Sequence, residues 1–182
     1  HSVACQVEFE VMCNVYEAKT IDVIQDMYGI RKNVSFTKKE MTIPVKCNSK
    51  PDNVRINDIS VVGYFKDLTS LSISNTDVYD ISSLARCSNL STLDLSGTKI
   101  SDITPLKDIL KLYDVNVSNT LLSDVTSLQG LVNLHFLNIE NTQVSDLSSL
   151  SNLDRLNEIN FSNTPVTDIN VLGNMPHLTK IY

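Results

Sequence analysis

The chain has 182 residues, of which 42% are hydrophobic and 20% are charged, and its net charge is −6. This composition predicts a folded domain with a buried core and is inconsistent with intrinsic disorder. No apolar run reaches the roughly 18 residues that a membrane-inserted helix requires, and the acidic balance excludes nucleic acid and anionic membranes as favoured partners, because phosphate recognition needs clustered Lys and Arg.

Residues 1–52 lack the pattern of the remaining chain, and we expect them to form an N-terminal mixed α/β cap. Residues 6–15 alternate apolar and polar side chains, as a strand with one buried face does. Residues 20–30 have helical features, with Thr20 in the N-cap position and Gly29 near the end. Residues 43–47 alternate again, and residues 37–40 are predicted as a hairpin turn. The cap is therefore predicted to be strand, helix and strand.

Three of the four cysteines lie in this predicted cap. Cys5 and Cys13 are separated by eight residues, which is about 27 Å along an unbroken strand, whereas the Cα atoms of a disulfide lie within about 7 Å. Cys47 is therefore the more natural partner for one of these two cysteines, and Cys13 and Cys47 are the chosen disulfide candidates; a disulfide would indicate an oxidising compartment. The alternative is three reduced, buried thiols.

Residues 53–182 contain a repeat with a period of 22 residues. Five successive segments read LSISNTDVYDISSL from Leu71, LDLSGTKISDITPL from Leu93, VNVSNTLLSDVTSL from Val115, LNIENTQVSDLSSL from Leu137 and INFSNTPVTDINVL from Ile159, and a sixth begins at Ile181. Each unit opens with two apolar residues two positions apart, which predicts a short strand with one buried face. The later three-residue apolar steps predict a 3₁₀-like return. Stacking such units buries a core that one unit could not bury alone.

The period and the phrase Ile100-Ser-Asp-Ile-Thr-Pro-Leu106 resemble the leucine-rich repeat family, most closely its internalin and phosphatase-regulator (SDS22-like) branch. The resemblance covers residues 54–182 and implies an α/β repeat solenoid with a concave parallel β-sheet and short 3₁₀ or irregular convex segments. We expect about five to six repeats, truncated or continued C-terminally, because Ile181-Tyr182 begins a strand without a polar cap. The internalin resemblance implies a helical cap, which differs from the mixed cap predicted here.

Two polar columns recur once in each repeat. Thr stands where the family's repeat has Asn, at Thr76, Thr98, Thr120, Thr142 and Thr164. We expect an inward hydroxyl ladder there rather than a binding row. Asp precedes the convex apolar residue at Asp58, Asp80, Asp102, Asp124, Asp146 and Asp168. A carboxylate column could suggest calcium binding or catalysis, but this position favours helix N-caps. Cys87 takes an apolar core position equivalent to that of Ile109.

The predicted concave face becomes acidic, amide-rich and aromatic toward its C-terminal end. Solvent-facing aromatic side chains are costly unless a partner covers them, and aromatic residues dominate interface hot spots. The candidate partner-binding residues are Tyr113, Asp114, His135, Phe136, Asn138, Glu140, Glu158 and Asn160. The alternative is that Asn116, Asn138 and Asn160 form a solvated ladder that the aromatic side chains merely cover.

The sequence contains no phosphate-binding loop, nucleophile elbow or metal-binding helix motif. We therefore expect no catalytic residues, no metal, no cofactor and no enzymatic activity. The favoured function is a protein-recognition module of an exported, periplasmic, extracellular or cell-surface protein that binds an unidentified protein partner through the concave face. One alternative, implied by the phosphatase-regulator resemblance, is a cytoplasmic regulatory subunit that docks on an enzyme. Another is a structural domain that self-associates through its uncapped C-terminal end.

Overall fold

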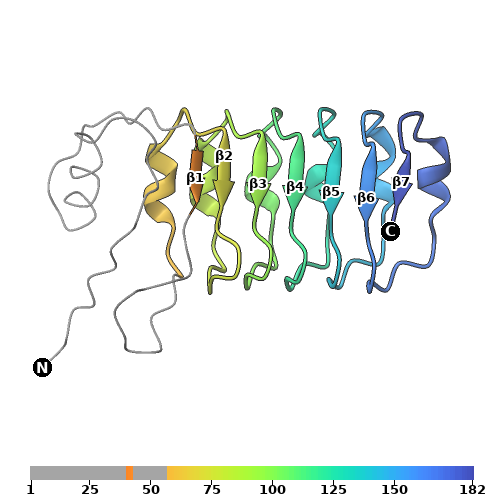
Figure 1. Cartoon of the computed structure of the whole chain (residues 1–182), viewed down its shortest axis with the longest axis horizontal. Helices are drawn as coiled ribbons and strands as arrows, with labels where there is room; N and C mark the ends of the chain where they lie inside the picture. Colours follow the sequence, from red (N-terminus) through yellow and green to blue (C-terminus); the bar gives the residue numbers. More distant parts are fainter. Residues whose placement is uncertain (1–39, 43–56) are drawn as a thin grey trace, which may run out of the picture.

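Each repeat places a short strand on one side of the molecule and a 3₁₀ helix on the other (Figure 1). The computed structural model describes residues 40–42 and 57–182. The strands are β1 Glu40–Thr42, β2 Ser70–Ser72, β3 Thr92–Asp94, β4 Asp114–Asn116, β5 Phe136–Asn138, β6 Glu158–Asn160 and β7 Lys180–Ile181. The 3₁₀ helices are η1 Ser60–Tyr64, η2 Ser82–Arg86, η3 Thr104–Leu106, η4 Thr126–Leu128, η5 Ser148–Asn152 and η6 Asn170–Asn174. The predicted repeat solenoid is therefore confirmed.

The described strands form one parallel sheet of seven in sequence order. From β2 onward each central apolar residue pairs with the residue 22 positions later, as Leu71 does with Leu93 and Leu93 with Val115. Because the strand register equals the sequence period, equivalent positions of successive repeats form straight columns across the sheet.

Strand β1 joins the sheet from within the residues of the predicted cap. Met41 pairs with Leu71 in parallel register, so the sheet begins within residues 1–52. Glu40 is the first residue of this strand, and the other residues of the predicted hairpin turn lie outside the described residues. Pairing with β2 satisfies backbone groups that an edge strand would leave unpaired. The predictions for residues 6–15, residues 20–30, Cys13 and Cys47 lie outside the described residues.

The core lies between the strands and the 3₁₀ helices. Leu93, Leu95, Ile100 and Leu106 of one repeat are each no more than 1% exposed. Cys87 is also fully buried, as predicted, and donates its thiol hydrogen to the carbonyl oxygen of Val62 at 3.4 Å. Desolvation by burial raises the pKa of this thiol to about 11, so it remains protonated and unreactive at neutral pH.

The threonine column closes the turn after each strand. Each hydroxyl donates to the backbone carbonyl oxygen three residues earlier, as in the Thr142–Ile139 bond at 2.7 Å. The hydroxyls therefore satisfy their own repeats instead of forming a hydroxyl-to-hydroxyl ladder. The preceding residue has a positive φ, supplied by Gly97 in one repeat and by Asn in the others, at Asn75, Asn119, Asn141 and Asn163. Gly and Asn are the residue types that adopt this left-handed conformation most readily.

The aspartate column stabilises the start of each 3₁₀ helix, one position earlier than predicted. An Asp Oδ1 atom accepts a hydrogen bond from the backbone N–H two residues later, as Asp124 does from Thr126 at 2.8 Å. The N-cap position itself belongs to the following apolar residue, such as Val125. The predicted capping role is therefore correct in its chemistry, and the carboxylate acts from the residue before the N-cap.

Candidate binding surface

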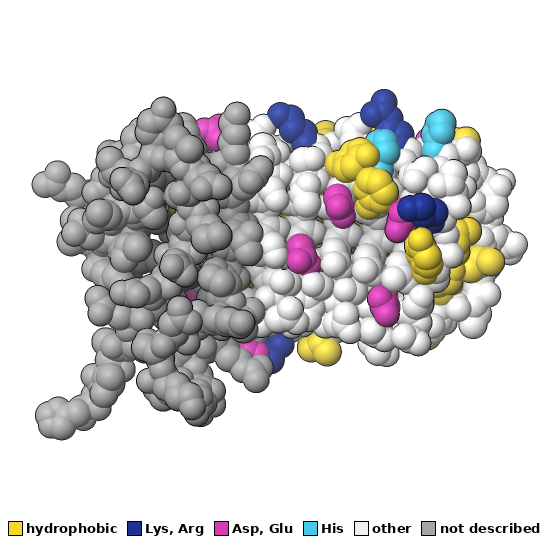
Figure 2. Space-filling model, viewed as in Figure 1, with side chains coloured by type: hydrophobic (Ala, Val, Ile, Leu, Met, Phe, Trp, Pro, Cys, Tyr) yellow, Lys and Arg dark blue, Asp and Glu magenta, His cyan; other side chains and the backbone are white. Residues whose placement is uncertain are grey.

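The solvent-facing side of strands β2–β7, here called the sheet face, consists of two parallel rows of side chains. From β2 to β6 the strand centres point into the core, so the residues on either side of each centre point outward. The first row is Ser70, Thr92, Asp114, Phe136, Glu158 and Lys180. The second row is Ser72, Asp94, Asn116, Asn138 and Asn160. Figure 2 shows hydrophobic and acidic side chains gathered over the C-terminal half of this face.

Three aromatic rings from two neighbouring repeats form a cluster at the edge of this face. The Tyr113 and His135 rings stack with their centroids 4.2 Å apart and an interplanar angle of 26°. Phe136 meets Tyr113 edge to face, with a centroid separation of 5.3 Å. Tyr113 remains 40% exposed, and His135 and Phe136 are half-buried. The cluster therefore holds its rings in fixed relative positions while presenting apolar area to solvent.

Asp114 lies directly beside Phe136 in the parallel register of β4 and β5. Desolvation raises the pKa of its carboxyl group, and the negative charges of Asp94 and Glu158 raise it further. Among residues 57–182, no side chain or backbone group forms a hydrogen bond or ion pair with this carboxylate. Asp114 is thus a half-buried carboxylate without a compensating positive charge in the described part of the chain.

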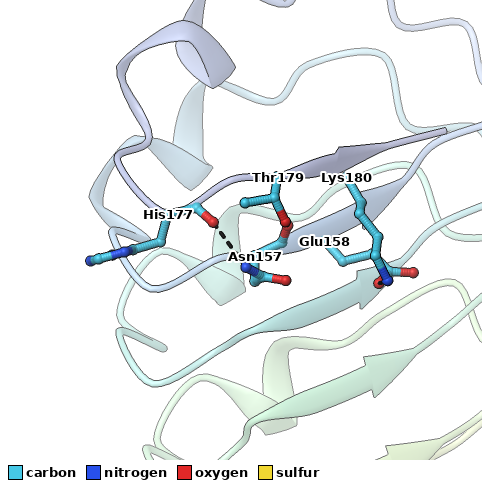
Figure 3. Close-up of polar contacts among 5 residues, drawn as sticks. All are labelled: Asn157, Glu158, His177, Thr179 and Lys180. Carbon is cyan, nitrogen blue, oxygen red and sulfur yellow. Dashed lines mark hydrogen bonds and ion pairs between the residues drawn. The ribbon is translucent and has the colours of Figure 1, made fainter.

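Glu158 lies on the other side of Phe136, and its charge is compensated from β7. The Lys180 ammonium contacts Glu158 Oε2 at 3.0 Å (Figure 3). This hydrogen bond and the attraction of the carboxylate raise the pKa of Lys180. Asn157 anchors the same two strands, because its side-chain amide donates to the His177 carbonyl oxygen at 3.0 Å. The His177 ring itself points away from Glu158 (Figure 3).

The second row is committed mainly to the backbone. Asn116, Asn138 and Asn160 each accept a hydrogen bond at Oδ1 from the backbone N–H two residues later, at 3.0–3.1 Å. The Asn160 amide also donates to Glu140 Oε2 at 3.2 Å. These amides therefore close their own turns and do not stack on one another as a ladder. Asn138 and Asn160 have correspondingly less hydrogen-bonding capacity for a partner than Asp114 has.

The His135 ring forms a hydrogen bond to the backbone of its own repeat. His135 Nδ1 lies 2.8 Å from the Asn133 carbonyl oxygen, which only accepts, so Nδ1 carries the proton of the neutral ring. Within residues 57–182 no carboxylate hydrogen-bonds to this imidazole to orient it as a base. The described residues also contain no group of three or more His, Cys, Asp or Glu side chains placed to hold a metal ion. None of their helices has the length and hydropathy needed to cross a membrane.

The structure brings the predicted residues of the first row and its edge together, in the order Tyr113, Asp114, His135, Phe136 and Glu158. Glu140 lies beyond the second row, where it accepts from Asn160. Two charged residues of the sheet face were not among the predicted partner-binding residues, namely Lys180 and Asp94. Lys180 stands one period after Glu158, and this spacing was the signal that could have identified it.

The chain is similar to leucine-rich repeat proteins of known structure. A family model described as leucine-rich repeats, in two copies, matches residues 66–108. Among solved structures, an internalin (inlF) of Listeria monocytogenes is 32% identical with a TM-score of 0.68, over 70% of this chain and 38% of that chain. A second internalin of that species (inlC2) is 31% identical with a TM-score of 0.68, over 69% and 56% of the two chains.

The fold also extends to more distant proteins. A leucine-rich repeat protein of Leptospira interrogans is 19% identical with a TM-score of 0.65, over 70% of this chain and 35% of that chain. A comparison with curated protein sequences finds no match. The alignments with the two internalins cover 38% and 56% of those chains, so the present chain spans only part of the length of these proteins.

Proposed function

The chain belongs to the leucine-rich repeat family, and from this membership we propose that it recognises a protein partner through the sheet face. Leucine-rich repeat domains are generally protein–protein interaction modules and are typically not enzymes. The observation that carries the proposal is the exposed cluster of Tyr113, His135 and Phe136. Rigid aromatic side chains supply large contact areas at low entropic cost, and they are enriched among the residues that dominate binding energy.

The acidic residues on either side of Phe136 also favour the sheet face as the binding surface. Asp114 and Glu158 flank Phe136 along the register of β4, β5 and β6. Charged groups around an apolar centre favour correct partners over wrong ones and accelerate encounter with a partner of opposite charge. A polar margin around an aromatic centre is also the usual anatomy of a protein interface.

We further propose that this recognition takes place outside the cytoplasm, on an exported or cell-surface protein. The two internalin structures, at 32% and 31% identity, support this assignment by similarity. The predicted Cys13–Cys47 disulfide would agree with it, because disulfides persist in oxidising compartments. Counting free thiols in the unfolded protein, with and without reductant, tests that pairing directly.

Saturable binding of the labelled chain to intact cells and to cytosolic fractions tests the proposal. We expect binding to intact cells, and we expect Phe136→Ala to weaken it by about tenfold or more. Tyr79→Ala is the matched control, since Tyr79 is an aromatic residue outside the strands and is 66% exposed. Binding confined to the cytosolic fraction would contradict export, and equal effects of the two variants would contradict use of the sheet face.

A further inference from the structure

We propose that the partner inserts an arginine side chain over Phe136, between the carboxylates of Asp114 and Glu158. The inference rests on the proposed function, because it names the chemistry that the sheet face recognises. The acidic–aromatic patch is defined here as Asp114, Phe136 and Glu158, with Tyr113 and His135 at its edge.

The sheet face carries more negative than positive side chains. From β2 to β7 the outward side chains of the strands and of the turns that follow them include four carboxylates, at Asp94, Asp114, Glu140 and Glu158. The same positions include one ammonium group, that of Lys180. Lys180 contacts Glu158, while Asp94 accepts hydrogen bonds from Ser72 and Ser96. Asp114 lacks such a contact among the described residues, so a positive charge from the partner would complete this row.

Phe136 lies between the two acidic residues along the register of the sheet. Asp114, Phe136 and Glu158 stand directly opposite one another on three adjacent parallel strands. Neighbouring strands are about 4.8 Å apart, so the two carboxylates flank the ring across roughly 10 Å. The backbone of Lys180 belongs to β7, on the far side of β6 from Phe136, and its ammonium reaches back to Glu158 Oε2. A cation above the ring would therefore meet an aromatic surface beneath it and a carboxylate on each side.

Arginine suits this site better than lysine does. A guanidinium is planar, stacks on aromatic rings and can present two parallel N–H donors to one carboxylate. It is also more weakly hydrated than an ammonium, which suits a half-buried site. The edge-to-face contact between Phe136 and Tyr113 keeps the Phe136 ring in place, and this fixed aromatic surface favours the planar group.

Selection from a phage library of random linear peptides, displayed to the purified chain, tests this inference. We expect binders enriched in arginine, with weaker binding when that arginine is replaced by citrulline, which keeps the shape and removes the charge. Asp114→Asn should reduce the affinity of these peptides by about tenfold or more, in the range of hot-spot residues. Asp108→Asn is the matched control, because Asp108 is an exposed residue in the segment after η3. This substitution also removes one negative charge, but at a position away from the strands.

The outcomes separate this inference from the proposed function. Peptides that lose affinity with Phe136→Ala but neither contain arginine nor respond to Asp114→Asn would overturn the arginine assignment and leave the sheet face as the binding surface. Selection that yields no binders, or only binders insensitive to both variants, would overturn the inference and the proposed function together. An equal loss of peptide affinity with Asp114→Asn and Asp108→Asn would show that the effect comes from net charge alone, and it would also overturn the arginine site.

Discussion

Tyr113 and Phe136 meet edge to face with ring centroids 5.3 Å apart, although they belong to successive repeats. The stacking of His135 on Tyr113 adds a third ring to the same cluster. Two of the three rings come from adjacent residues of one chain segment, and the register of β4 and β5 brings the third beside them. The repeat therefore creates a preorganised aromatic surface without a dedicated loop.

The Tyr113–Phe136 contact should be measurable as a coupling free energy. Tyr113→Ala and Phe136→Ala, singly and together, are expected to give about 0.5–1.5 kcal/mol of coupling in the free energy of unfolding. Urea denaturation of the four proteins provides the measurement. Tyr79→Ala combined with Phe136→Ala should be additive, because no ring contact joins those residues. Additivity of the Tyr113 and Phe136 variants would show that the two rings do not stabilise each other.

Asp114→Asn should stabilise the free protein at neutral pH. The pKa of Asp114 is raised above 3.8, chiefly by desolvation, so the folded state disfavours its charged form. Stability linked to this group is therefore fully present below pH 3.8 and is lost as the pH rises through the higher folded-state pKa. The gain from Asp114→Asn is expected to be below about 1 kcal/mol at neutral pH, because solvent screens a half-exposed group. It should vanish at strongly acidic pH.

Urea denaturation at neutral and strongly acidic pH measures that difference, with Asp108→Asn as the control. Destabilisation by Asp114→Asn at neutral pH would mean that the Asp114 carboxylate has a stabilising partner. That result would also weaken the argument that a ligand supplies the missing positive charge. Stabilisation of the free chain combined with loss of binding is the pattern expected where function and stability compete.

Thr142→Val should test the role of the threonine column. The Thr142 hydroxyl is 1% exposed and donates to the Ile139 carbonyl oxygen at 2.7 Å. Valine keeps the shape but removes the donor, so we expect a loss of about 1–2 kcal/mol in the free energy of unfolding. Thr142→Ser keeps the hydroxyl donor and should therefore lose less stability than Thr142→Val does. Equal losses for valine and serine would assign the cost to packing instead of the hydrogen bond.

Asp124→Ala should lower stability by removing an acceptor at the start of η4. Asp124 Oδ1 accepts from the Thr126 hydroxyl at 2.6 Å and from the Thr126 backbone N–H at 2.8 Å. These bonds lower the pKa of Asp124, so their contribution is present above pH 3.8 and is lost as the pH falls through the folded-state pKa. We expect a cost of about 0.5–1 kcal/mol at neutral pH. Asp124→Asn keeps the oxygen acceptor, and thermal unfolding should place it between alanine and the parent chain.

The repeat fold could be predicted from the sequence because one period controls strand register and core together. Leu71 and Leu93 pair in the sheet as the 22-residue spacing predicts, and Cys87 occupies the core position predicted for it. The N-cap falls one residue after the predicted Asp because the apolar residue that follows occupies it, as Val125 does, and from Ile59 to Leu147 this residue is also buried in the core. Composition and period do not distinguish those two adjacent positions.

Other features depended on pairing that periodicity does not encode. Met41 lies 30 residues before its partner Leu71, so β1 does not share the 22-residue period, and the period could not identify this strand. The sequence shows that Asp114 and Asp94 point outward, but only the contacts reveal that Ser72 and Ser96 hydrogen-bond to Asp94. The difference in hydrogen bonding between Asp94 and Asp114 therefore becomes visible only in the three-dimensional structure.

Site-specific photocrosslinking tests the central claim, that the sheet face contacts the partner, most directly. A photoreactive phenylalanine analogue at position 136 or at position 79 would be irradiated in the presence of bound cells, and covalent adducts would be compared. The account predicts a discrete adduct from position 136, on β5, and none from position 79, which lies outside the strands. An adduct formed equally from both positions, or from position 79 alone, would contradict it.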